Sequence, residues 1–418
     1  MTASVHWWGG GPGSADATPI EQTLELERLW SEGAVVALAR PEERPALAGV
    51  LPRCGDPWQP WGPGVLIGSG GSSGERRWCL QPLDHLRQSA AASATWLRAI
   101  GIDPAGTILF NPLPLHHVSG LLPLVRSRQW GVPQQELSPA LMRHPRELAA
   151  RVILPTDRQA LLSLVPTQLQ RLMADPIGVE WLAGFEVIWV GGAPLAASLA
   201  AAARQVGIRL APCYGATETA AMVAALAPQA FLEGQEGCGQ ALADVELRLA
   251  AAGAIEVRTG RLSPGWLRTD GSGLQPLAGP GGWWRSGDLG QLGGGGLQIF
   301  GRSDGAIQSG GETVFPARLE QELRSRLNRA GIELSELLLL PVADPEWGER
   351  LVALFRAQDN GESAVHRLME AALALPPPQR PWRWIPCPGL ERNPLGKWEL
   401  NRWRVWLDQR DSQETTAP

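Results

Sequence analysis

Short apolar runs alternate with segments of helical spacing along residues 65–211, and this alternation constrains the fold more than any other feature of the sequence. The runs predict β-strands because they are brief and are bounded by loops rich in glycine or proline. The predicted strands are residues 65–67, 107–111, 161–165, 185–190 and 209–211. The predicted helices between them include residues 83–100, 166–173 and 195–206. Strands that alternate with helices are typical of parallel layers, so the sequence predicts a layered α/β domain.

The pattern changes twice toward the C-terminus. From about residue 245, short strands separated by glycine clusters indicate a small, barrel-like β subdomain. Beyond residue 301, a helix, a strand and a second helix predict a small α+β domain; they are residues 316–329, 337–342 and 363–375. We therefore expect two domains, residues 1–301 and 302–418. The polar tail after Asp408 is expected to fray.

Composition excludes several classes of protein. Of the 418 residues, 44% are hydrophobic and 19% are charged, which suffices for a sizeable core. The net charge of −5 gives no reason to expect a nucleic-acid partner. No apolar run has the length of a membrane span, and the N-terminus lacks the pattern of a signal peptide. The five scattered cysteines form no CxxC pair, so neither a disulfide framework nor a zinc site is indicated. We expect a cytoplasmic protein.

Lys397 is the single lysine of the chain, so nearly all of the positive charge is arginine. It ends a predicted tight turn that begins at Arg392. An exposed lysine is usually a solvated surface group. In a chain from which surface lysines are missing, the one that remains is a candidate functional residue.

A loop of glycine and serine follows the first predicted strand. Backbone N–H groups freed by glycine, together with serine hydroxyls, could cradle a phosphate. The alternative is a flexible surface loop, and no Walker A sequence follows. The loop consists of Ser69, Gly70, Gly71, Ser72, Ser73 and Gly74.

Two further segments carry polar groups in loops. Thr217 and Glu218 follow the strand predicted at 209–211 and could hold a phosphate and its Mg²⁺. The alternative is a helix N-cap made by Thr217 or Thr219. Asp288, in a Ser-Gly-Asp turn, could accept both hydroxyls of a ribose, although an Asx-turn is the commoner role for such a residue.

Taken in order, these motifs resemble those of the ANL superfamily of adenylate-forming enzymes, which contains acyl-CoA synthetases, adenylation domains and luciferases. The resemblance covers residues 66–402. The loop at 69–74 is similar to the superfamily's phosphate loop, and residues 214–219 and 286–288 match YGxTE and [ST]GD. Residues 301–312 resemble GRxDDxIxxGGE, and residues 393–397 match NPxGK.

Within the superfamily, two segments are similar to the o-succinylbenzoate–CoA ligases of menaquinone and phylloquinone biosynthesis. Residues 113–120 resemble PLFHVSGL, and residues 163–169 resemble SLVPTQL. The resemblance implies a reaction in two halves. A substrate carboxylate attacks the α-phosphate of MgATP to give an acyl-adenylate and pyrophosphate, and the thiol of coenzyme A then displaces AMP.

The resemblance also implies roles for individual residues. The loop at 69–74 would hold the β- and γ-phosphates, Thr217 the α-phosphate and Glu218 the Mg²⁺. Lys397 would bridge the attacking carboxylate and the α-phosphate in the first half-reaction. The nucleoside and coenzyme A would be held by Gly191, Gly192, Ala193, Tyr214 and Gly215 (adenine), Asp288 and Arg302 (ribose), and Gly310 and Gly311 (pantetheine).

The chain departs from the superfamily's pattern at three places. Arg76 and Arg77 stand where the phosphate loop usually ends in proline and lysine, and Gly305 replaces the second aspartate of GRxDD. Arginine still supplies cationic donors, so ATP binding is expected to persist. Asp304 matches the position about which the small domain pivots. The N-terminal region is shortened, which affects the rim of the acid pocket and the dimer contacts.

o-Succinylbenzoate carries a second carboxylate, which must be held away from the phosphate by polar groups. The candidates are His117, which lies in the substrate-facing motif and is also a catalytic candidate, Ser119 and Arg126. The alternatives are that His117 is a satisfied core histidine and Arg126 a surface charge.

Three other functions stay open at this point: a ligase for another acyl or aryl acid, an adenylation enzyme that loads a carrier protein, and a non-catalytic nucleotide-binding relative. The expected partners are a small carboxylic acid, ATP and coenzyme A, and the sequence leaves a homodimer open.

Overall fold

The computed structural model describes residues 5–8, 19–51, 58, 60–70, 76–357, 362–393 and 398–416. The chain forms two compact units built from interleaved segments. The first comprises Met1–Leu195, Ala202–Ser286 and Gln291–Gln298, and the second Ala196–Ala201, Gly287–Gly290 and Ile299–Pro418. The functional boundary after residue 301 stays a prediction.

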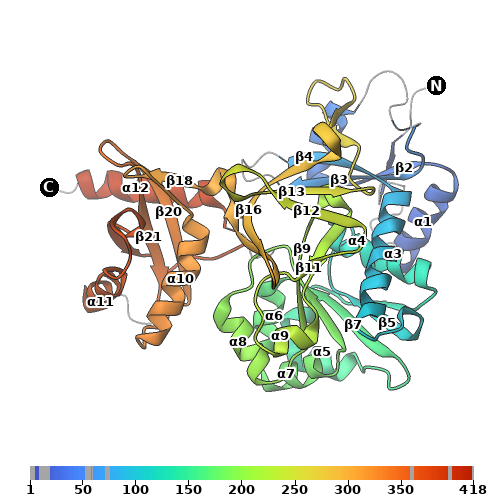
Figure 1. The fold of residues 1–418 in the computed structure, drawn as a ribbon, viewed down its shortest axis with the longest axis horizontal. Helices are drawn as coiled ribbons and strands as arrows, with labels where there is room; N and C mark the ends of the chain where they lie inside the picture. The colour runs from blue at the N-terminus through green and yellow to red at the C-terminus, as the bar shows by residue number, and fades with distance from the viewer. Residues whose placement is uncertain are drawn as a thin grey trace. The chain divides into compact units, whose positions relative to one another are not determined.

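A seven-stranded sheet forms the centre of the first unit (Figure 1). Its strands follow the order β11-β10-β9-β8-β7-β5-β6; β6, β5, β7, β8 and β9 run parallel, and β10 pairs antiparallel with both of its neighbours, β9 and β11. The central parallel strands β5, β7 and β8 are mostly apolar and buried, as is usual where helices cover a parallel sheet. The layered α/β architecture predicted from the alternation is therefore confirmed. The bounds are β5 Thr107–Asn111, β6 Gln134–Glu136, β7 Gln159–Leu164, β8 Val187–Val190, β9 Leu210–Ala216, β10 Ala221–Ala225 and β11 Gln240–Ala241.

Two helices, α3 (Leu83–Ala99) and α4 (Val118–Trp130), pack between this sheet and a second sheet. Their apolar faces join a core with residues of β2 and β3, whereas Trp96 of α3 packs on Trp189 of β8 with ring centroids 6.1 Å apart. Helix α4 ends at Gly131, whose φ of 68° forms a left-handed C-cap. This sandwiched position places side chains of α3 and α4 against the ends of the parallel strands.

The second sheet has six strands in the order β1-β2-β3-β4-β14-β15. In the antiparallel pair β3–β4, Ser69 lies opposite Arg77 and Gly70 opposite Arg76. Ser69 and Gly70 therefore belong to a strand, and their assignment to a loop was wrong: the strand continues three residues beyond the apolar run because ladder hydrogen bonds, not side-chain apolarity, extend it. The bounds are β1 His6–Trp7, β2 Val35–Leu38, β3 Gly64–Gly70, β4 Arg76–Pro82, β14 Gly265–Leu267 and β15 Leu274–Pro276.

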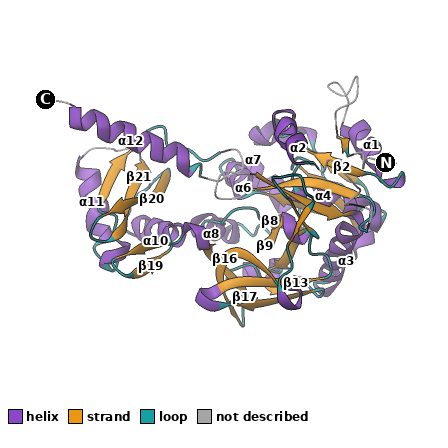
Figure 2. Ribbon diagram, turned by 90° about the horizontal axis from the view of Figure 1, so that it is seen from above, coloured by secondary structure: helices purple, strands orange, loops and turns teal. Residues whose placement is uncertain are grey.

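A four-stranded sheet corresponds to the predicted β subdomain, and Figure 2 shows three of its strands, β13, β16 and β17. Its order is β12-β13-β16-β17, with bounds β12 Val245–Leu249, β13 Ala254–Thr259, β16 Trp284–Gly293 and β17 Gly296–Arg302. The other helices of this part of the chain are α1 Pro19–Ser31, α2 Arg44–Val50, α5 Pro145–Arg151, α6 Pro166–Met173, α7 Pro176–Ala183, α8 Ala197–Gln205 and α9 Pro228–Leu232.

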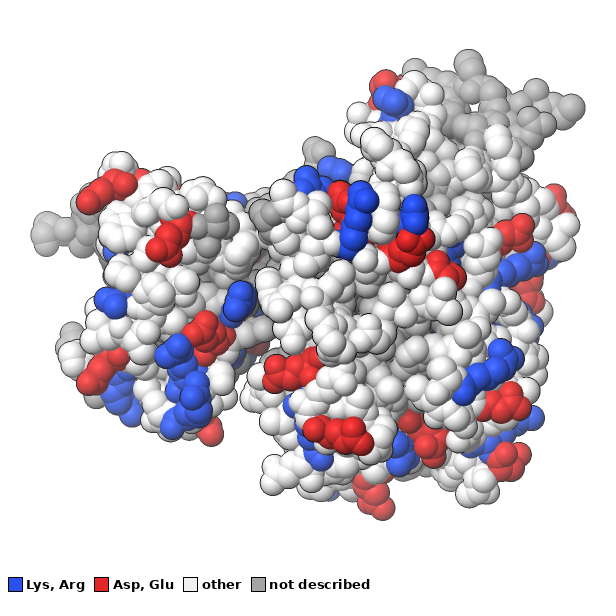
Figure 3. Space-filling view, in the orientation of Figure 1, with Lys and Arg blue, Asp and Glu red and all other residues white. Residues whose placement is uncertain are grey.

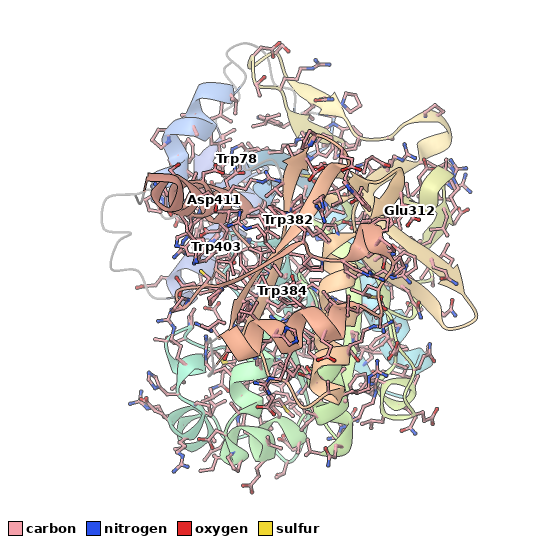
Figure 4. All side chains as sticks on the ribbon, turned by 90° about the vertical axis from the view of Figure 1, so that its left-hand side faces the viewer. Trp78, Glu312, Trp382, Trp384, Trp403 and Asp411 are labelled. Atoms are coloured by element: carbon pink, nitrogen blue, oxygen red, sulfur yellow. The ribbon has the colours of Figure 1, made fainter. Side chains whose placement is uncertain are left out.

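The second unit contains a five-stranded sheet covered on both faces. Its order is β19-β18-β21-β20, with β22 parallel to β21. One face packs on α10 and α11 through a core that includes Trp384, and the other on α12 through a core that includes Trp403 (Figure 4). The bounds are β18 Ile307–Ser309, β19 Glu312–Val314, α10 Pro316–Arg329, β20 Glu336–Asp344, β21 Gly348–Arg356, α11 Glu362–Ala372, β22 Arg383–Pro386 and α12 Leu400–Thr416.

The prediction that the tail frays after Asp408 was wrong, because α12 continues to Thr416. Trp403 and Leu407 of this helix are buried in the core against the sheet, and its Asp411 accepts two hydrogen bonds from Arg383 at 2.8 and 3.0 Å. The polar composition of the segment after Asp408 gave no sign of these stabilising contacts.

Charged side chains of both signs lie next to one another on the face drawn in Figure 3. Many are joined in short-range ion pairs, such as Arg28–Glu32 and Arg248–Glu256. Within the described residues, no helix combines the length and the apolar character that crossing a bilayer requires.

Candidate active site

The carboxyl ends of β8 and β9 bring together residues that the sequence placed around the adenine. Val190 pairs with Pro212, so Gly191 follows next to Cys213 and Tyr214. A Cβ at position 191 would lie 2.9 Å from Cys213 Sγ, which explains why this residue is glycine. Ligands of α/β sheets bind at this edge. The structure thus places the loop of Gly191, Gly192 and Ala193 beside half-buried Tyr214.

Glu218 lies in a single 3₁₀ turn, Thr217–Thr219, directly after β9. It is 7% exposed, and its Oε1 accepts a hydrogen bond of 3.0 Å from Trp266 Nε1. Its backbone carbonyl accepts another, of 2.7 Å, from the N–H of Ser263. The Glu218 side chain is therefore buried, and both of these hydrogen bonds come from the segment that contains Ser263 and Trp266.

The alternative reading, in which a threonine caps the turn, applies to Thr219. Its hydroxyl accepts a hydrogen bond of 3.1 Å from the N–H of Ala216 and donates to the carbonyl of Ala221 at 2.8 Å. Thr219 is buried, whereas Thr217 is half-buried. The capping role thus belongs to Thr219, and the roles predicted for Thr217 and Glu218 stay predictions.

The backbone is strained immediately after Glu218. Ala220 and Ala221 have φ values of 50° and 72° and are the only non-glycine residues with positive φ among the described residues. Ser89 Oγ donates to the carbonyl of Ala220 at 2.6 Å, and Arg261 donates to the carbonyls of Thr219 and Met222. Strain that is held by several contacts is common at functional sites.

Arg126 lies inside the first unit and is 4% exposed, so the reading of a surface charge was wrong. Its Nη2 donates to Ser93 Oγ at 3.0 Å, and its guanidinium lies 4.5 Å from the centre of the Trp189 ring. In the part of the chain that the structure describes, Arg126 Nε and Trp189 Nε1 are both buried without a hydrogen-bond partner. Burial lowers the pKa of Arg126 to about 10, so the side chain remains a cation at neutral pH.

His117 and Ser119 lie at the start of the same helix. His117 is the N-cap residue of α4, half-buried, with its ring centroid 4.5 Å from that of His116. Ser119 is exposed in the first turn. A Cβ at Gly120 would meet the carbonyl oxygen of Pro114 at 2.2 Å, so the glycine lets this loop pack on the helix. The three candidates thus share one helix, but only Arg126 is buried.

The two residues predicted to hold the ribose face each other in the second unit. Arg302 Nη1 lies 3.6 Å from Asp288 Oδ1. Ser303 Oγ donates to the carbonyl of Gly287 at 2.9 Å, which ties the two turns together. Both groups are polar and accessible in part, as ribose recognition requires.

Gly310 and Gly311 form the turn between β18 and β19 and have φ values of 56° and 83°. A Cβ at Gly310 would meet the ring of Trp347 at 2.7 Å. Close packing on Trp347 therefore explains the first glycine without a ligand. Their predicted contact with pantetheine stays a prediction.

Several predicted site residues lie outside the described residues. These are Gly71, Ser72, Ser73 and Gly74 of the phosphate loop, Lys397, and the side chain of the hinge candidate Asp304.

The residues present fit a magnesium ion bound together with a nucleotide. Among the described residues no three His, Cys, Asp or Glu side chains gather as a metal cluster. Magnesium in nucleotide sites is commonly held by one or two carboxylates and the phosphates themselves, and Glu218 can supply one of these ligands.

Sequence reasoning missed Trp189, Trp266 and Arg261. Each acts across a long separation: Trp266 contacts Glu218 over 48 residues and Arg261 contacts Thr219 over 42. In a chain with 19 tryptophans and 37 lysine and arginine residues, composition did not single them out.

Comparison with known proteins agrees with this geometry. A 2-succinylbenzoate–CoA ligase of Listeria monocytogenes is 27% identical over 304 residues, covering 72% of this chain and 61% of the relative. A probable 2-succinylbenzoate–CoA ligase of Mycobacterium tuberculosis is 28% identical over 341 residues, covering 78% of this chain and 79% of the relative. The chain thus spans about three fifths of the length of the Listeria relative.

The solved structures show the same fold. The o-succinylbenzoate CoA synthetase of Bacillus subtilis, in complex with its acyl-adenylate intermediate, superposes with a TM-score of 0.65 at 23% identity, covering 81% of this chain and 68% of that one. The family model described as AMP-binding enzyme matches residues 20–273, which is more than half of the chain. On these grounds, and on the motif turn built around Glu218, the chain belongs to the family of AMP-binding enzymes.

Proposed function

We propose that this protein is an ATP-dependent acid–CoA ligase that converts o-succinylbenzoate to o-succinylbenzoyl-CoA through an acyl-adenylate. The names of the relatives in Listeria and Mycobacterium support this function, as do the ordered motifs of the sequence. The turn that carries Thr217 and Glu218 lies where an AMP-binding enzyme needs it, at the carboxyl end of a parallel strand.

The observation that carries the choice of acid is the environment of Arg126. The guanidinium of Arg126 lies over the Trp189 ring, and both Arg126 Nε and Trp189 Nε1 are buried donors without an acceptor among the described residues. A buried guanidinium with no anionic partner is costly, and the face of an indole offsets only part of that cost. A carboxylate supplies the missing charge and the missing acceptors. This pair therefore supports a substrate with a second carboxylate, as o-succinylbenzoate has.

In the first half-reaction, the succinyl carboxylate attacks the α-phosphorus of ATP. The new bond joins a carboxylate oxygen to phosphorus, and pyrophosphate leaves with the electrons of the broken P–O bond. We assign Thr217 and Lys397 to the charge that develops on the α-phosphate and the segment at 69–74 to the β- and γ-phosphates. Mg²⁺, when bound, would supply further charge neutralisation at the phosphates, and Glu218 would be its protein ligand.

In the second half-reaction, the thiol sulfur of coenzyme A attacks the acyl carbon, and AMP leaves. We assign residues 1–301 to the binding of ATP and acid and residues 302–418 to a lid that turns about Asp304 between the two halves. Gly310 and Gly311 would then border the pantetheine arm, where the absence of side chains permits close approach. Gly191–Ala193 and Tyr214 are assigned to the adenine, and Asp288 and Arg302 to the ribose.

Release of pyrophosphate across a panel of acids tests the proposal. With o-succinylbenzoate the protein should release pyrophosphate, and added coenzyme A should yield the thioester and AMP. Greatest turnover with an acid that lacks a second carboxylate would reject the choice of substrate. Adenylate formation without any thioester would favour an adenylation enzyme for a carrier protein, and absence of pyrophosphate with every acid would favour a non-catalytic relative.

A further inference from the structure

We infer that Trp266 is a positioning residue for Glu218: its indole N–H fixes one carboxylate oxygen so that the other is presented to a nucleotide-bound metal ion. This inference rests on the proposed function, because it deepens the role assigned there to Glu218. No motif of the sequence pointed to Trp266, and the contact is visible only in the folded chain.

The geometry of the carboxylate supports this role. Trp266 Nε1 lies 3.0 Å from Glu218 Oε1 and donates a hydrogen bond to it. Among the described residues, this is the one hydrogen bond between a side chain and the Glu218 carboxylate. The donor is neutral, whereas a lysine or arginine in its place would compete with a cation for the same oxygens. One oxygen is thereby oriented and the second is left for a metal ligand bond.

The segment that carries Trp266 is itself fixed from several sides. Ser263 Oγ donates to the carbonyl of Leu80 at 2.6 Å, and the N–H of Ser263 donates to the carbonyl of Glu218 at 2.7 Å. Trp266 lies opposite Cys79 in the β4–β14 ladder and packs on the core between α3, α4 and the six-stranded sheet. The indole therefore has little freedom to follow a carboxylate that moves, and it imposes its own position on Glu218.

Arg77 completes the arrangement. Its guanidinium lies 4.8 Å from the centre of the Trp266 ring. Residues two apart on a strand share a face, so Arg77 and Cys79 point to the same side of β4, and Arg77 reaches the diagonal neighbour Trp266. A cation over the ring face stabilises the orientation of the indole. The arginine that replaces the usual lysine of the phosphate loop thus contacts the tryptophan that orients the proposed metal ligand.

Replacement of Trp266 by phenylalanine tests the inference, because it keeps an aromatic ring for Arg77 and for the core but removes the donor. Binding of Mn²⁺ is measured by electron paramagnetic resonance in the presence of a non-hydrolysable ATP analogue, so the readout does not depend on turnover. We expect Trp266→Phe to weaken Mn²⁺ binding by about 10-fold, the size of one hydrogen bond to a charged group. Excess Mg²⁺ should restore the rate of pyrophosphate release.

Trp130→Phe is the matched control. Trp130 is also half-buried, and its Nε1 donates to the carbonyl of Ala90 at 3.0 Å in another part of the unit. This variant loses an equivalent hydrogen bond, so it should lower thermal stability without changing Mn²⁺ affinity. A second variant, Trp266→Tyr, supplies a hydroxyl donor and should bind Mn²⁺ more tightly than Trp266→Phe. If Trp266→Phe does not fold, Trp266→Tyr is compared with Trp130→Phe instead. Its Mn²⁺ affinity should then be close to that of Trp130→Phe.

Comparison with Glu218→Gln separates this inference from the function beneath it. If Glu218→Gln weakens Mn²⁺ binding and Trp266→Phe does not, the positioning role is rejected while the metal assignment stands. If Glu218→Gln binds Mn²⁺ as the wild type does, the metal assignment fails and the inference fails with it. In the double variant, Trp266→Phe should cause no further loss beyond that of Glu218→Gln, and additive losses would overturn a role that acts through Glu218.

Discussion

Among the described residues of the first unit, two arginines are buried, and the polar groups around them differ. Arg261 is fully buried and donates to Asp244 and to two backbone carbonyls, so its charge and its donors are matched. Arg126 contacts a serine hydroxyl and an indole face, and no carboxylate of the described residues pairs with it. Arg261 is thus a buried arginine paired with an internal acid, whereas Arg126 lacks such a partner in the described part of the chain. That contrast is why we assign Arg126 to an external anion.

The first prediction concerns Arg126 as a partner of the acid. Arg126→Leu should raise KM for o-succinylbenzoate by about 10–100-fold, the ~1.5–3 kcal/mol of a charged hydrogen bond. KM for ATP and for coenzyme A should barely change, because neither touches this side chain in the proposed arrangement. Steady-state pyrophosphate release at varied acid, ATP and coenzyme A concentrations measures the three constants.

Arg128→Leu provides the control for this variant, because Arg128 lies on the same helix but is exposed and paired with Glu27. It should leave all three KM values unchanged. An analogue without the ring carboxylate should bind wild type and Arg126→Leu alike. A rise in KM for all three substrates together would mean that Arg126 is structural and that the ring carboxylate binds elsewhere.

The second prediction concerns Lys397, which is the single lysine of the chain. Lys397→Ala should slow adenylate formation by roughly 10²–10³-fold, the effect of removing one donor to the transition state. Thioester formation from supplied acyl-adenylate should be nearly unchanged, because the proposed rotation removes the lysine before that step. Rapid-quench measurement of each half-reaction distinguishes the two, and equal losses in both would contradict the assignment.

At the scale of elements, the turn between β9 and β10 is held in place rather than intrinsically stable. Two alanines with positive φ follow Glu218, and each such residue costs about 1 kcal/mol. Arg261, between β13 and β14, bonds to carbonyls on both sides of these alanines. Gln81 of β4 donates to the carbonyl of Thr217 at 2.5 Å. Elements distant in sequence thus maintain the conformation that aims Glu218.

The third prediction tests whether Arg261 stabilises the turn between β9 and β10. Arg261→Leu leaves Asp244 and two carbonyls without their partner and should lower the free energy of unfolding by about 3–5 kcal/mol, as loss of one member of a buried pair does. Urea denaturation measures the change. Arg258→Leu is the control from the neighbouring strand, since Arg258 forms an exposed pair with Glu246, and it should leave the denaturation midpoint nearly unchanged. Similar losses in both variants would show that the turn does not depend on Arg261.

Elements were more predictable from the sequence than contacts between them. The predicted bounds of β5 and α10 agree with the structure to the residue, because both are short periodic segments with clear boundaries. The Glu218–Trp266 bond and the burial of Arg126 could not be predicted, since each depends on how layers stack. The end of α12 was missed for the same reason: its stability comes from Trp403, Leu407 and the Asp411–Arg383 pair, not from helix propensity.

At the scale of the whole molecule, the proposed function requires one site to serve two reactions with different attacking groups. The proposed rotation about Asp304 solves this by exchanging Lys397 for the Gly310–Gly311 segment between the halves. Asp304 lies in the turn Ser303–Gly305, near Ile299, where the main stretch of the second unit begins. A turn at such a place can change the course of the chain through few dihedral angles.

The last prediction concerns a proline substitution that restricts the backbone of this turn. The N–H of Ala306 donates to the carbonyl of Ser303 at 3.3 Å, which makes residue 304 the second position of a turn, where proline is favoured. Asp304→Pro should therefore be accommodated without loss of thermal stability while φ at this position is restricted to about −65°. If the domain pivots here, one half-reaction should slow far more than the other, because only one orientation remains accessible. Single-turnover assays of adenylate formation and of thioester formation decide the matter: parallel loss of both with a lower Tm would instead assign residues 302–305 to a simple connecting segment.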